Sequence, residues 1–359
     1  MSLNFKRHFG TAIIIDRVSM QRVWFNKTYS SVATAIKLIR EADLAGHYEL
    51  ICSNTNAHAG AFLAAHEYAI EPAGLSGDAY LDWCLEFCRE HSITIFWPGK
   101  EAGLIAQQRA RFEQQGTRVL SVATRETLAL MHDKARFCAG LDLPIAPPAQ
   151  FCAVDTIAQY DSAYDLLRPL HRKLCIKPSE SVYGLGFAIL DEERSGAQLL
   201  LAGAQYHVNA RELRAGLAEM GQFKPLLLME YLDGYEYSAD CVADDGVLIC
   251  AVPRKKPHVG GQGQLIDLRD DILQACTQLT RSYRLNGIFN IQFREGKNGL
   301  ALLEINPRMS GGIGMACAAG PNLPYIALRG FDCGFSQVPV PLIRNGMRVG
   351  ELALAVELP

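Results

Sequence analysis

Residues 287–308 read GIFNIQFREGKNGLALLEINPR, and this stretch carries the strongest structural signal in the chain. Two apolar-rich runs, 288–294 and 300–306, flank the turn signal Lys297-Asn298-Gly299, which predicts a β-hairpin. Because successive side chains of a strand point to opposite faces, the first run has one apolar and one polar face. The apolar face holds Phe289, Ile291 and Phe293, and the polar face holds Asn290, Gln292 and Arg294.

The register of this hairpin decides whether its polar side chains meet. A three-residue loop, 297–299 with glycine in the left-handed position, sets Gln292 opposite Glu304, and the same register pairs Asn290 with Asn306. A two-residue loop, 298–299, sets Gln292 opposite Ile305 instead, because a slip of one residue moves side chains to the other face. Only the first register gathers the amide and carboxylate oxygens on one face, and we therefore predict it.

Converging oxygen donors with a single carboxylate suit Mg²⁺, which takes few protein ligands and completes its octahedron with water and phosphate oxygens. The alternative is the solvated polar face of an edge hairpin. Pro307 and Arg308 follow the second strand directly. An arginine beside a metal site is where a phosphoryl group in transfer needs charge stabilisation, so we favour the metal site.

A second segment, 173–186, places Lys177 at the end of a short strand and follows it with a serine- and glycine-bearing turn. One ammonium and several backbone N–H groups could hold a phosphate there, although an ordinary hairpin turn explains the same pattern. The chain has no G-x-x-x-x-G-K-[ST] sequence, which excludes a P-loop.

A third segment, 226–238, is an apolar strand that ends at Glu230, turns, and enters a new strand at Glu236. An apolar slot with hydrogen-bonding edges would suit a purine and its ribose. Two exposed glutamates flanking a turn are the alternative.

The first third of the chain alternates strand-like and helical stretches, which predicts a small parallel sheet. No G-x-G-x-x-G follows its first strand, which disfavours a dinucleotide-binding dehydrogenase. The turns Tyr29-Ser30-Ser31 and Pro98-Gly99-Lys100-Glu101 should face a cleft, although turn chemistry alone could explain both. We expect strands at Ile13–Ile15, Tyr48–Cys52, Ile93–Trp97 and Val119–Val122, and helices at Ser31–Glu41 and Tyr80–His91.

The pattern changes after the proline-containing stretch 143–148, which cannot continue a helix. Antiparallel hairpins follow, with 237–243 pairing 247–252, and helices are expected at 210–220 and 270–283. An α/β region is therefore followed by an α+β region.

Composition limits the partners. The 359 residues hold 35 basic and 38 acidic side chains, a formal net charge of -3, so neither nucleic acid nor a membrane is expected as a partner. No apolar run approaches the ~18 residues of a membrane span, and no signal peptide is expected.

The eleven cysteines form no framework, so we expect free thiols and a cytoplasmic location. Cys84, Cys88 and His91 have helical spacing, which favours packing over metal binding.

Taken in order, these segments resemble the ATP-grasp family, most closely its carboxylate–amine ligase branch, which includes the carbamoyl-phosphate synthetase large subunit and the D-alanine ligases. Asn290-Ile-Gln292 followed by LEINPRMSGG at 303–312 is the most specific match. The resemblance implies an ATP-grasp fold, α/β plus α+β. It places a Rossmann-like pre-ATP-grasp domain at 1–122, an ATP-grasp domain at 123–335 with its lid at about 150–228, and a tail, 336–359, packed on the ATP-grasp domain.

The resemblance also implies site roles. The ATP phosphates would be contacted by Lys134, by Lys177 and by the lid loop with Ser181, Gly184 and Gly186. Glu230, Tyr231 and Leu232 would form the adenine hinge, and Glu236 would hold the ribose hydroxyls. Metal ligands would be Gln292, Glu304 and Asn306, where many family members have a carboxylate in place of Gln292. Arg308 would lie near the γ-phosphate.

The basic run 254–258 before the glycine-rich residues 260–263 matches no family pattern. It is either a solvated face or it meets the acceptor carboxylate or the phosphates. We therefore expect a catalytic set of Arg308, Lys177 and Arg254.

The implied activity is ATP-dependent phosphorylation of a carboxylate to an acyl phosphate, which an amine then attacks. ATP and one or two Mg²⁺ ions would be required, with Mn²⁺ as a substitute, and the partners would be a small carboxylate, an amine and a second copy in a homodimer. The alternatives are a thiol acceptor, release of the acyl phosphate, and a non-catalytic nucleotide-binding module. Acceptor selectivity is expected in the first third and in 254–263.

Overall fold

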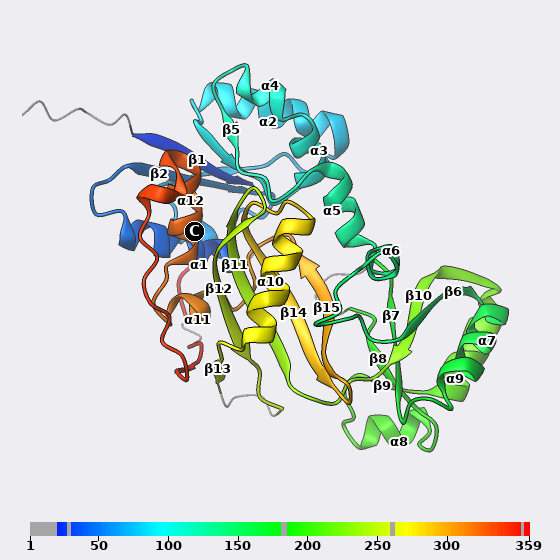
Figure 1. The fold of residues 1–359 in the computed structure, drawn as a ribbon. Coiled ribbons are helices and arrows are strands. Elements are labelled where there is room, and N and C mark those ends of the chain that lie inside the picture. Colours follow the sequence, from blue (N-terminus) through cyan, green and yellow to red (C-terminus); the bar gives the residue numbers. More distant parts are fainter. Residues whose placement is uncertain (1–19, 27–29, 181–184, 259–262, 353–354) are drawn as a thin grey trace, which may run out of the picture.

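Three β-sheets follow one another along the chain in the computed structural model, which describes residues 20–26, 30–180, 185–258, 263–352 and 355–359. Figure 1 shows the third sheet in the middle of the molecule, with the first and second sheets on either side. The mixed α/β and α+β architecture predicted from the sequence is confirmed. No helix in these ranges is long and apolar enough to cross a membrane.

The first sheet is parallel, with strand order β3-β2-β1-β4-β5. Alternate residues of β1 bury opposite faces: Val23 and Phe25 pack toward α1, whereas Trp24 packs toward α2. The strands are β1 (Gln21–Asn26), β2 (Tyr48–Asn54), β3 (Glu67–Ile70), β4 (Ile95–Trp97) and β5 (Arg118–Val119). The helices are α1 (Ser30–Ala42), η1 (Gly60–Leu63), α2 (Gly77–Glu90), α3 (Ala102–Gln107) and α4 (Arg109–Glu113).

The central strand of this sheet, β1, was missed by the sequence analysis. Its apolar run is only Val23-Trp24-Phe25 between polar residues, so it carries little periodic signal. The strand expected at Ile13–Ile15 lies outside the described residues. The predicted helices are confirmed to within a few residues at each end. Cys84 and Cys88 lie on the buried face of α2 and pack in the core, as expected.

The second sheet has the order β6-β10-β7-β8-β9, and α7 and α9 cover one of its faces. Along β10, Leu226 and Leu228 pack toward these helices, whereas Leu227 and Met229 point to the opposite face. That second face borders the cavity described below. The elements are β6 (Phe151–Thr156), α7 (Ile157–Leu167), β7 (Leu174–Pro178), β8 (Ala188–Asp191), α8 (Gly196–Leu201), β9 (His207–Asn209), α9 (Ala210–Met220) and β10 (Gln222–Glu230).

The third sheet is antiparallel, with order β15-β14-β11-β12-β13-β16. Its strands are β11 (Glu236–Asp244), β12 (Val247–Lys255), β13 (Gln264–Ile266), β14 (Gly287–Gly296), β15 (Gly299–Asn306) and β16 (Arg348–Val349). The helices near it are α5 (Arg125–His132), α6 (Lys134–Ala139), α10 (Asp270–Ser282), α11 (Ile313–Cys317), α12 (Leu323–Cys333) and η2 (Phe335–Gln337).

The hairpin β14–β15 has the predicted register, but a different turn produces it. Gln292 lies opposite Glu304, and Asn290 opposite Asn306. Gly296 pairs with Gly299, so the loop holds two residues rather than the three expected. A bulge at Leu303 then shifts the register by one residue and restores the predicted pairing.

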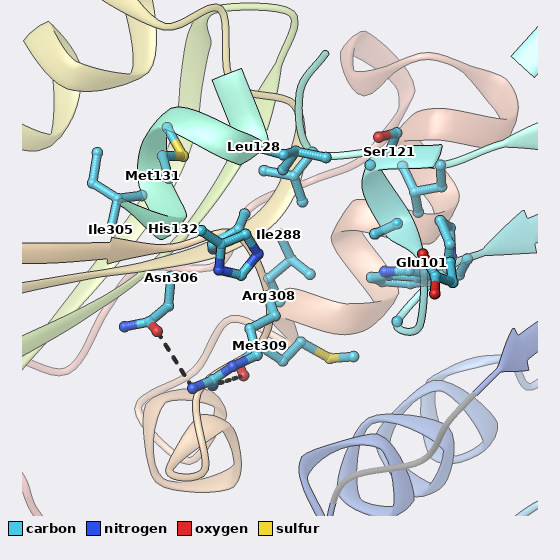
Figure 2. A pocket seen from close by; sticks show the side chains of 18 of the residues that line it. Glu101, Ser121, Leu128, Met131, His132, Ile288, Ile305, Asn306, Arg308 and Met309 are labelled. Carbon is cyan, nitrogen blue, oxygen red and sulfur yellow. Dashed lines mark hydrogen bonds between the residues drawn. The ribbon is translucent and has the colours of Figure 1, made fainter. Parts of the chain in front are cut away.

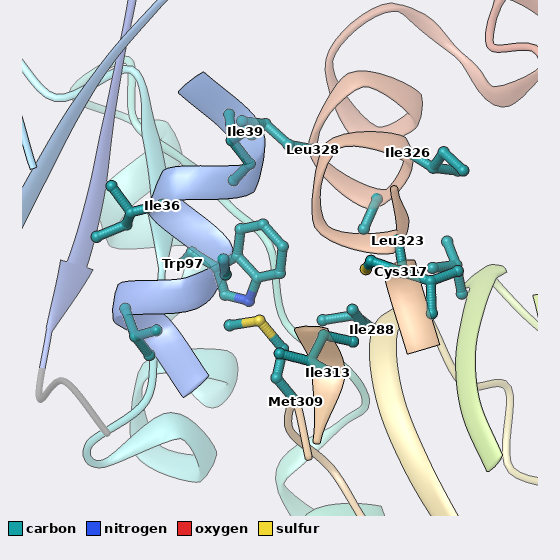
Figure 3. Close-up of a cluster of buried hydrophobic side chains, with 14 of the residues drawn as sticks. Ile36, Ile39, Trp97, Ile288, Met309, Ile313, Cys317, Leu323, Ile326 and Leu328 are labelled. Carbon is teal, nitrogen blue, oxygen red and sulfur yellow. The ribbon is translucent and has the colours of Figure 1, made fainter. Parts of the chain in front are cut away.

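One continuous core joins the first and third sheets, with α1 and α12 packed between them. Figure 3 shows Ile39 of α1 beside Leu328 of α12 and Ile36 on the opposite side of α1, with Trp97 and Ile288 near the centre of the cluster. All five side chains are almost completely buried. Because both sheets contribute to this core, the ends of their strands are held in a fixed relation.

Arg269 joins the start of α10 to β14. Its guanidinium donates to Asp271 at 2.6 Å and to the Tyr237 hydroxyl at 3.2 Å, and it pairs with Glu295 at 2.5 Å. The hydrogen bond from Arg269 holds the pKa of Asp271 below its ordinary value of 3.8. This contribution to stability is therefore present above pH 3.8 and is lost as the pH falls through the folded-state pKa.

We predict that Asp271→Asn removes this acid sensitivity. Between pH 5 and pH 2.5, the unfolding free energy of the wild type should fall by about 1 kcal/mol more than that of the variant. Urea unfolding at a series of pH values measures the difference. Asp270→Asn, on the exposed neighbouring residue, is the control and should keep the wild-type slope; equal slopes in all three proteins would contradict the prediction.

Candidate active site

Two cavities meet at the C-terminal end of β15. The larger, ≈ 780 Å³, lies between the second and third sheets, and the smaller, ≈ 430 Å³, lies where the first sheet adjoins the third. Their linings share three residues, Lys134, Glu304 and Arg308. A molecule in one cavity could therefore react with a molecule in the other at these three side chains.

Lys134 and Lys177 reach this junction from two elements that are tied together. Lys134 opens α6 directly after the N-cap Asp133, which accepts a hydrogen bond from Ser179 Oγ at 2.7 Å. The Lys134 backbone N–H also donates to the Ser179 carbonyl at 3.2 Å. Since Ser179 follows the end of β7, where Lys177 lies, these bonds bring the two lysines to one site.

Lys134 is buried, with 7% of its surface exposed, and its Nζ lies 3.7 Å from Glu304 Oε2. Burial lowers the pKa of Lys134 below its ordinary value of 10.5, the carboxylate of Glu304 acts in the opposite direction, and the charge of Lys177 lowers the pKa further. An anion bound here would therefore relieve an unfavourable concentration of positive charge.

The oxygen donors predicted for a metal come together on β14 and β15. Asn306 Nδ2 donates to Glu304 Oε1 at 2.8 Å, and Gln292 Nε2 donates to Asn290 Oδ1 at 3.4 Å. Asn290 is held in turn by the Ser238 hydroxyl and by Asp240. The amide nitrogens of Gln292 and Asn306 thus bond within the protein, and Asn306 Oδ1 accepts a hydrogen bond from Arg308 at 3.4 Å.

This donor set is chemically suited to Mg²⁺: it consists of hard oxygen atoms with one carboxylate. Gln292 lines the larger cavity, Asn306 the smaller, and Glu304 both. Among the residues that the structure describes, no group of three or more His, Cys, Asp or Glu side chains is placed to hold a metal ion.

The far end of the larger cavity is formed by the segment predicted to hold a purine. Glu230, Tyr231, Leu232 and Glu236 all line it. The backbone N–H of Glu230 donates to Gln150 O at 2.9 Å. Glu236 pairs with Lys256, which also lines the cavity. The lining also includes apolar side chains, those of Cys175, Ile189, Met229 and Leu303. The segment thus has the expected apolar slot with polar edges, and its ligand stays a prediction.

The predicted lid residues are only partly visible. Ser181 and Gly184 lie outside the described residues. Gly186 has φ +79°, and a Cβ there would lie 2.7 Å from Pro178 Cγ, so both backbone conformation and space require glycine.

Arg254 departs from the predicted catalytic set, because its side chain lines neither of the two cavities. Its side chain is 2% exposed and pairs with Asp240 at 2.8 Å, and it also donates to Ser310 Oγ at 3.0 Å. Sequence patterns show a basic run but not that its first member points inward from β12. Arg254 thus contacts Asp240 and Ser310 and does not border either cavity.

We predict that Asp240→Asn destabilises the protein by about 3 kcal/mol, because it leaves the buried Arg254 charge without its counter-ion. Urea unfolding followed by circular dichroism measures this. Asp244→Asn, at the exposed end of the same strand, is the matched control and should change stability by less than about 0.5 kcal/mol. Equal, small effects in the two variants would show that the pair does not hold this region together.

The smaller cavity was not predicted as a unit, although two of its turns were singled out. Ser31, Pro98, Gly99 and Glu101 line it, as the strand-to-helix turns suggested. Figure 2 shows Glu101 on one side of this cavity and Asn306 and Arg308 on the other. The missed signal is topological: β1 lies between β2 and β4, and a crevice forms where the strand order reverses.

The comparison with protein families gives one match, over residues 222–354, to the family described as "ATP-grasp in the biosynthetic pathway with Ter operon". The arginine-specific carbamoyl phosphate synthase large chain of Geobacillus stearothermophilus is 26% identical over 300 residues, which cover 79% of this chain and 25% of that one. The corresponding large chain of Thermoanaerobacter sp. is 25% identical over 55% of this chain and 18% of that one. The chain therefore spans a quarter or less of the length of these relatives.

Solved structures share the fold over nearly the whole chain. An ADP complex of N5-carboxyaminoimidazole ribonucleotide synthetase has a TM-score of 0.65 at 12% identity, covering 92% of this chain and 80% of that one. The L-amino acid ligase of Bacillus licheniformis has a TM-score of 0.60 at 13% identity, covering 87% and 74%. Residues 222–354 thus match an ATP-grasp family, and nearly the whole chain shares its fold with these solved structures.

Proposed function

We propose that the protein is an ATP- and Mg²⁺-dependent ligase that phosphorylates a substrate carboxylate and joins the resulting acyl phosphate to an amine. The observation that carries the proposal is the meeting of two cavities at Lys134, Glu304 and Arg308. A nucleotide-binding module would need only the larger cavity. A second cavity that opens on the same charged side chains supports a second substrate.

The nucleotide would occupy the larger cavity. Its base would lie in the apolar slot near Leu232, its ribose near Glu236 and its phosphates near Lys134 and Lys177. In this proposal residues 1–122 form the pre-ATP-grasp domain, residues of about 150–228 the lid, and 336–359 a tail on the ATP-grasp domain 123–335. Closure of the second sheet over the phosphates would exclude water from an acyl phosphate, which water would otherwise hydrolyse.

Catalysis would rest on positioning and charge neutralisation, as in other phosphoryl transfers. Lys134 and Lys177 would neutralise the phosphate oxygens. Arg308 donates to the Met309 carbonyl at 2.9 Å, which holds its guanidinium where both cavities end. From there it would meet the phosphoryl group as that group passes to the carboxylate.

Gln292, Glu304 and Asn306 would hold the Mg²⁺ ion, which when bound would supply charge neutralisation to the phosphate oxygens. Two ions, or Mn²⁺ as a substitute, remain part of the proposal.

A thiol acceptor, or release of the acyl phosphate to water, is the second candidate within the same chemistry. Both share the first step, so the mass of the product separates them from amide formation.

Hydroxylamine tests the proposed first step, because it converts an acyl phosphate to a hydroxamate whatever the natural acceptor is. With ATP, Mg²⁺ and a panel of carboxylates, we expect hydroxamate and ADP in equal amounts for at least one member. Chelation of Mg²⁺ with EDTA should abolish both products, and added Mg²⁺ should restore them. ADP formation that is independent of every carboxylate, or no ADP from a protein that binds ATP, would contradict the proposal.

A further inference from the structure

The smaller cavity has opposite charges at its two sides. Lys134, Arg308 and the Glu304 carboxylate that pairs with Lys134 line the junction with the larger cavity, where the two cations outnumber the one carboxylate. Glu101 reaches the cavity from the turn between β4 and α3 (Figure 2). Between them the wall is largely apolar and includes Leu128, Ile288 and Met309. A ligand that fills this space would present an anionic group to one side and a cationic group to the other.

Glu101 is built into the wall rather than placed there by an exposed loop. Its backbone has φ +54°, a left-handed conformation that costs a non-glycine residue about 1–2 kcal/mol. The turn is fixed by the buried Asn26, whose Oδ1 accepts hydrogen bonds from the backbone N–H of Gly99 at 2.6 Å and of Lys100 at 3.2 Å. The Tyr80 hydroxyl holds Asn26 in turn, at 3.0 Å.

The neighbouring lysine does not neutralise this carboxylate. Lys100 Nζ lies 3.7 Å from the buried Glu71 and over the ring of Tyr80. Within the described ranges, Glu101 forms no ion pair, and its carboxylate accepts one long hydrogen bond, from Gly77 N at 3.4 Å. The other basic residues of the lining are Arg125, which donates to Gln107, and His132. Glu101 thus contributes negative charge to a half-buried site.

From this geometry, and resting on the proposed function, we infer that the carboxylate substrate also bears an ammonium group, which Glu101 binds while Lys134 and Arg308 receive the carboxylate. The substrate class is therefore an amino acid with a small or apolar body. A single volume of ≈ 430 Å³ is large enough for such a molecule.

Glu101 suits an ammonium that keeps its proton. A carboxylate beside an amine favours the charged form of that amine, whereas the attacking amine must be neutral. Glu101 therefore fits the amino group of the carboxyl donor and not the nucleophile. The effect of removing Glu101 should accordingly appear in the KM of the donor rather than in the chemical step.

Hydroxamate formation measured with paired probes tests this inference. Each pair consists of an α-, β- or ω-amino acid and the carboxylic acid that lacks its amino group, for example L-leucine with 4-methylpentanoate and L-phenylalanine with 3-phenylpropanoate. For the wild type we expect kcat/KM to be about 10–100-fold higher for the amino acid of at least one pair. Glu101→Gln should lose most of this preference because the KM of the amino acid rises. The kcat/KM of the deaminated acid and the KM of ATP should stay unchanged.

Glu113→Gln, at an exposed position of α4, is the matched control, and thermal unfolding shows whether each variant is folded. Two results would overturn the inference and leave the proposed function standing. One is an equal kcat/KM for the deaminated acids and their amino acids, and the other is a Glu101→Gln effect that is equal on both members of a pair. Absence of hydroxamate from every probe, in a protein that binds ATP, would overturn both.

Discussion

Replacement of Glu304 by alanine is expected to lower the rate of ADP formation by about 10³-fold while ATP still binds. Glu304 is the one carboxylate in the predicted metal set, and it also faces the buried Lys134 at 3.7 Å. The substitution removes the charged ligand and leaves two amide oxygens, which bind a divalent cation weakly. Binding should survive because the apolar slot and Lys177 are untouched.

Steady-state ADP formation and ATP titration by calorimetry, each over a range of Mg²⁺ concentrations, measure the two effects separately. Glu304→Gln keeps the shape of the side chain, and high Mg²⁺ should restore part of its rate of ADP formation. High Mg²⁺ should not restore the rate of Glu304→Ala. Glu295→Ala is the control for the hairpin, because Glu295 lies on β14 and pairs with Arg269. A Glu304→Ala protein with near wild-type turnover would remove the metal site from this position.

Replacement of Arg308 by alanine is expected to lower kcat by about 10²–10³-fold with little change in the KM of ATP. Its guanidinium is oriented by Met309 O at 2.9 Å and by Asn306 Oδ1 at 3.4 Å, and it lines both cavities. An interaction made chiefly in the transition state lowers kcat rather than ground-state binding. Arg308→Lys should recover only part of the rate, because an ammonium cannot reproduce the planar fork of a guanidinium.

Arg284→Ala removes an exposed arginine and serves as the control for the loss of one positive charge. If Arg308→Ala instead raised the KM of ATP and left kcat unchanged, Arg308 would belong to nucleotide binding, and the transfer step would lack its proposed stabilising cation.

The hairpin could be predicted because apolar and polar residues alternate along its first strand. Phe289, Ile291 and Phe293 are completely buried, and Gln292 faces Glu304 as expected. The route to that register could not be predicted, because the bulge at Leu303 compensates for a shorter turn, and a bulge leaves no distinctive local sequence.

Other parts of the site depend on contacts between distant segments. Arg254 stands in a basic run that resembles a solvated face, yet it points to Asp240 on the neighbouring strand. The smaller cavity requires that β1 lie beside β4, about 70 residues later in the chain, and that both approach β15. Periodicity in one segment carries no information about such neighbours, which is why Glu101 was seen only as part of a turn.

The fate of carboxylate oxygen tests the central claim most directly. A carboxylate substrate labelled with ¹⁸O, found in the hydroxamate panel, is turned over with ATP, Mg²⁺ and hydroxylamine, which attacks the acyl carbon and displaces phosphate, and the inorganic phosphate released is analysed by mass spectrometry. If the γ-phosphoryl group passes to the carboxylate, the phosphate released will carry one ¹⁸O atom from the substrate for each ADP formed. Phosphate without substrate-derived ¹⁸O, formed at the same rate as ADP, would show that no acyl phosphate is made and would contradict the account.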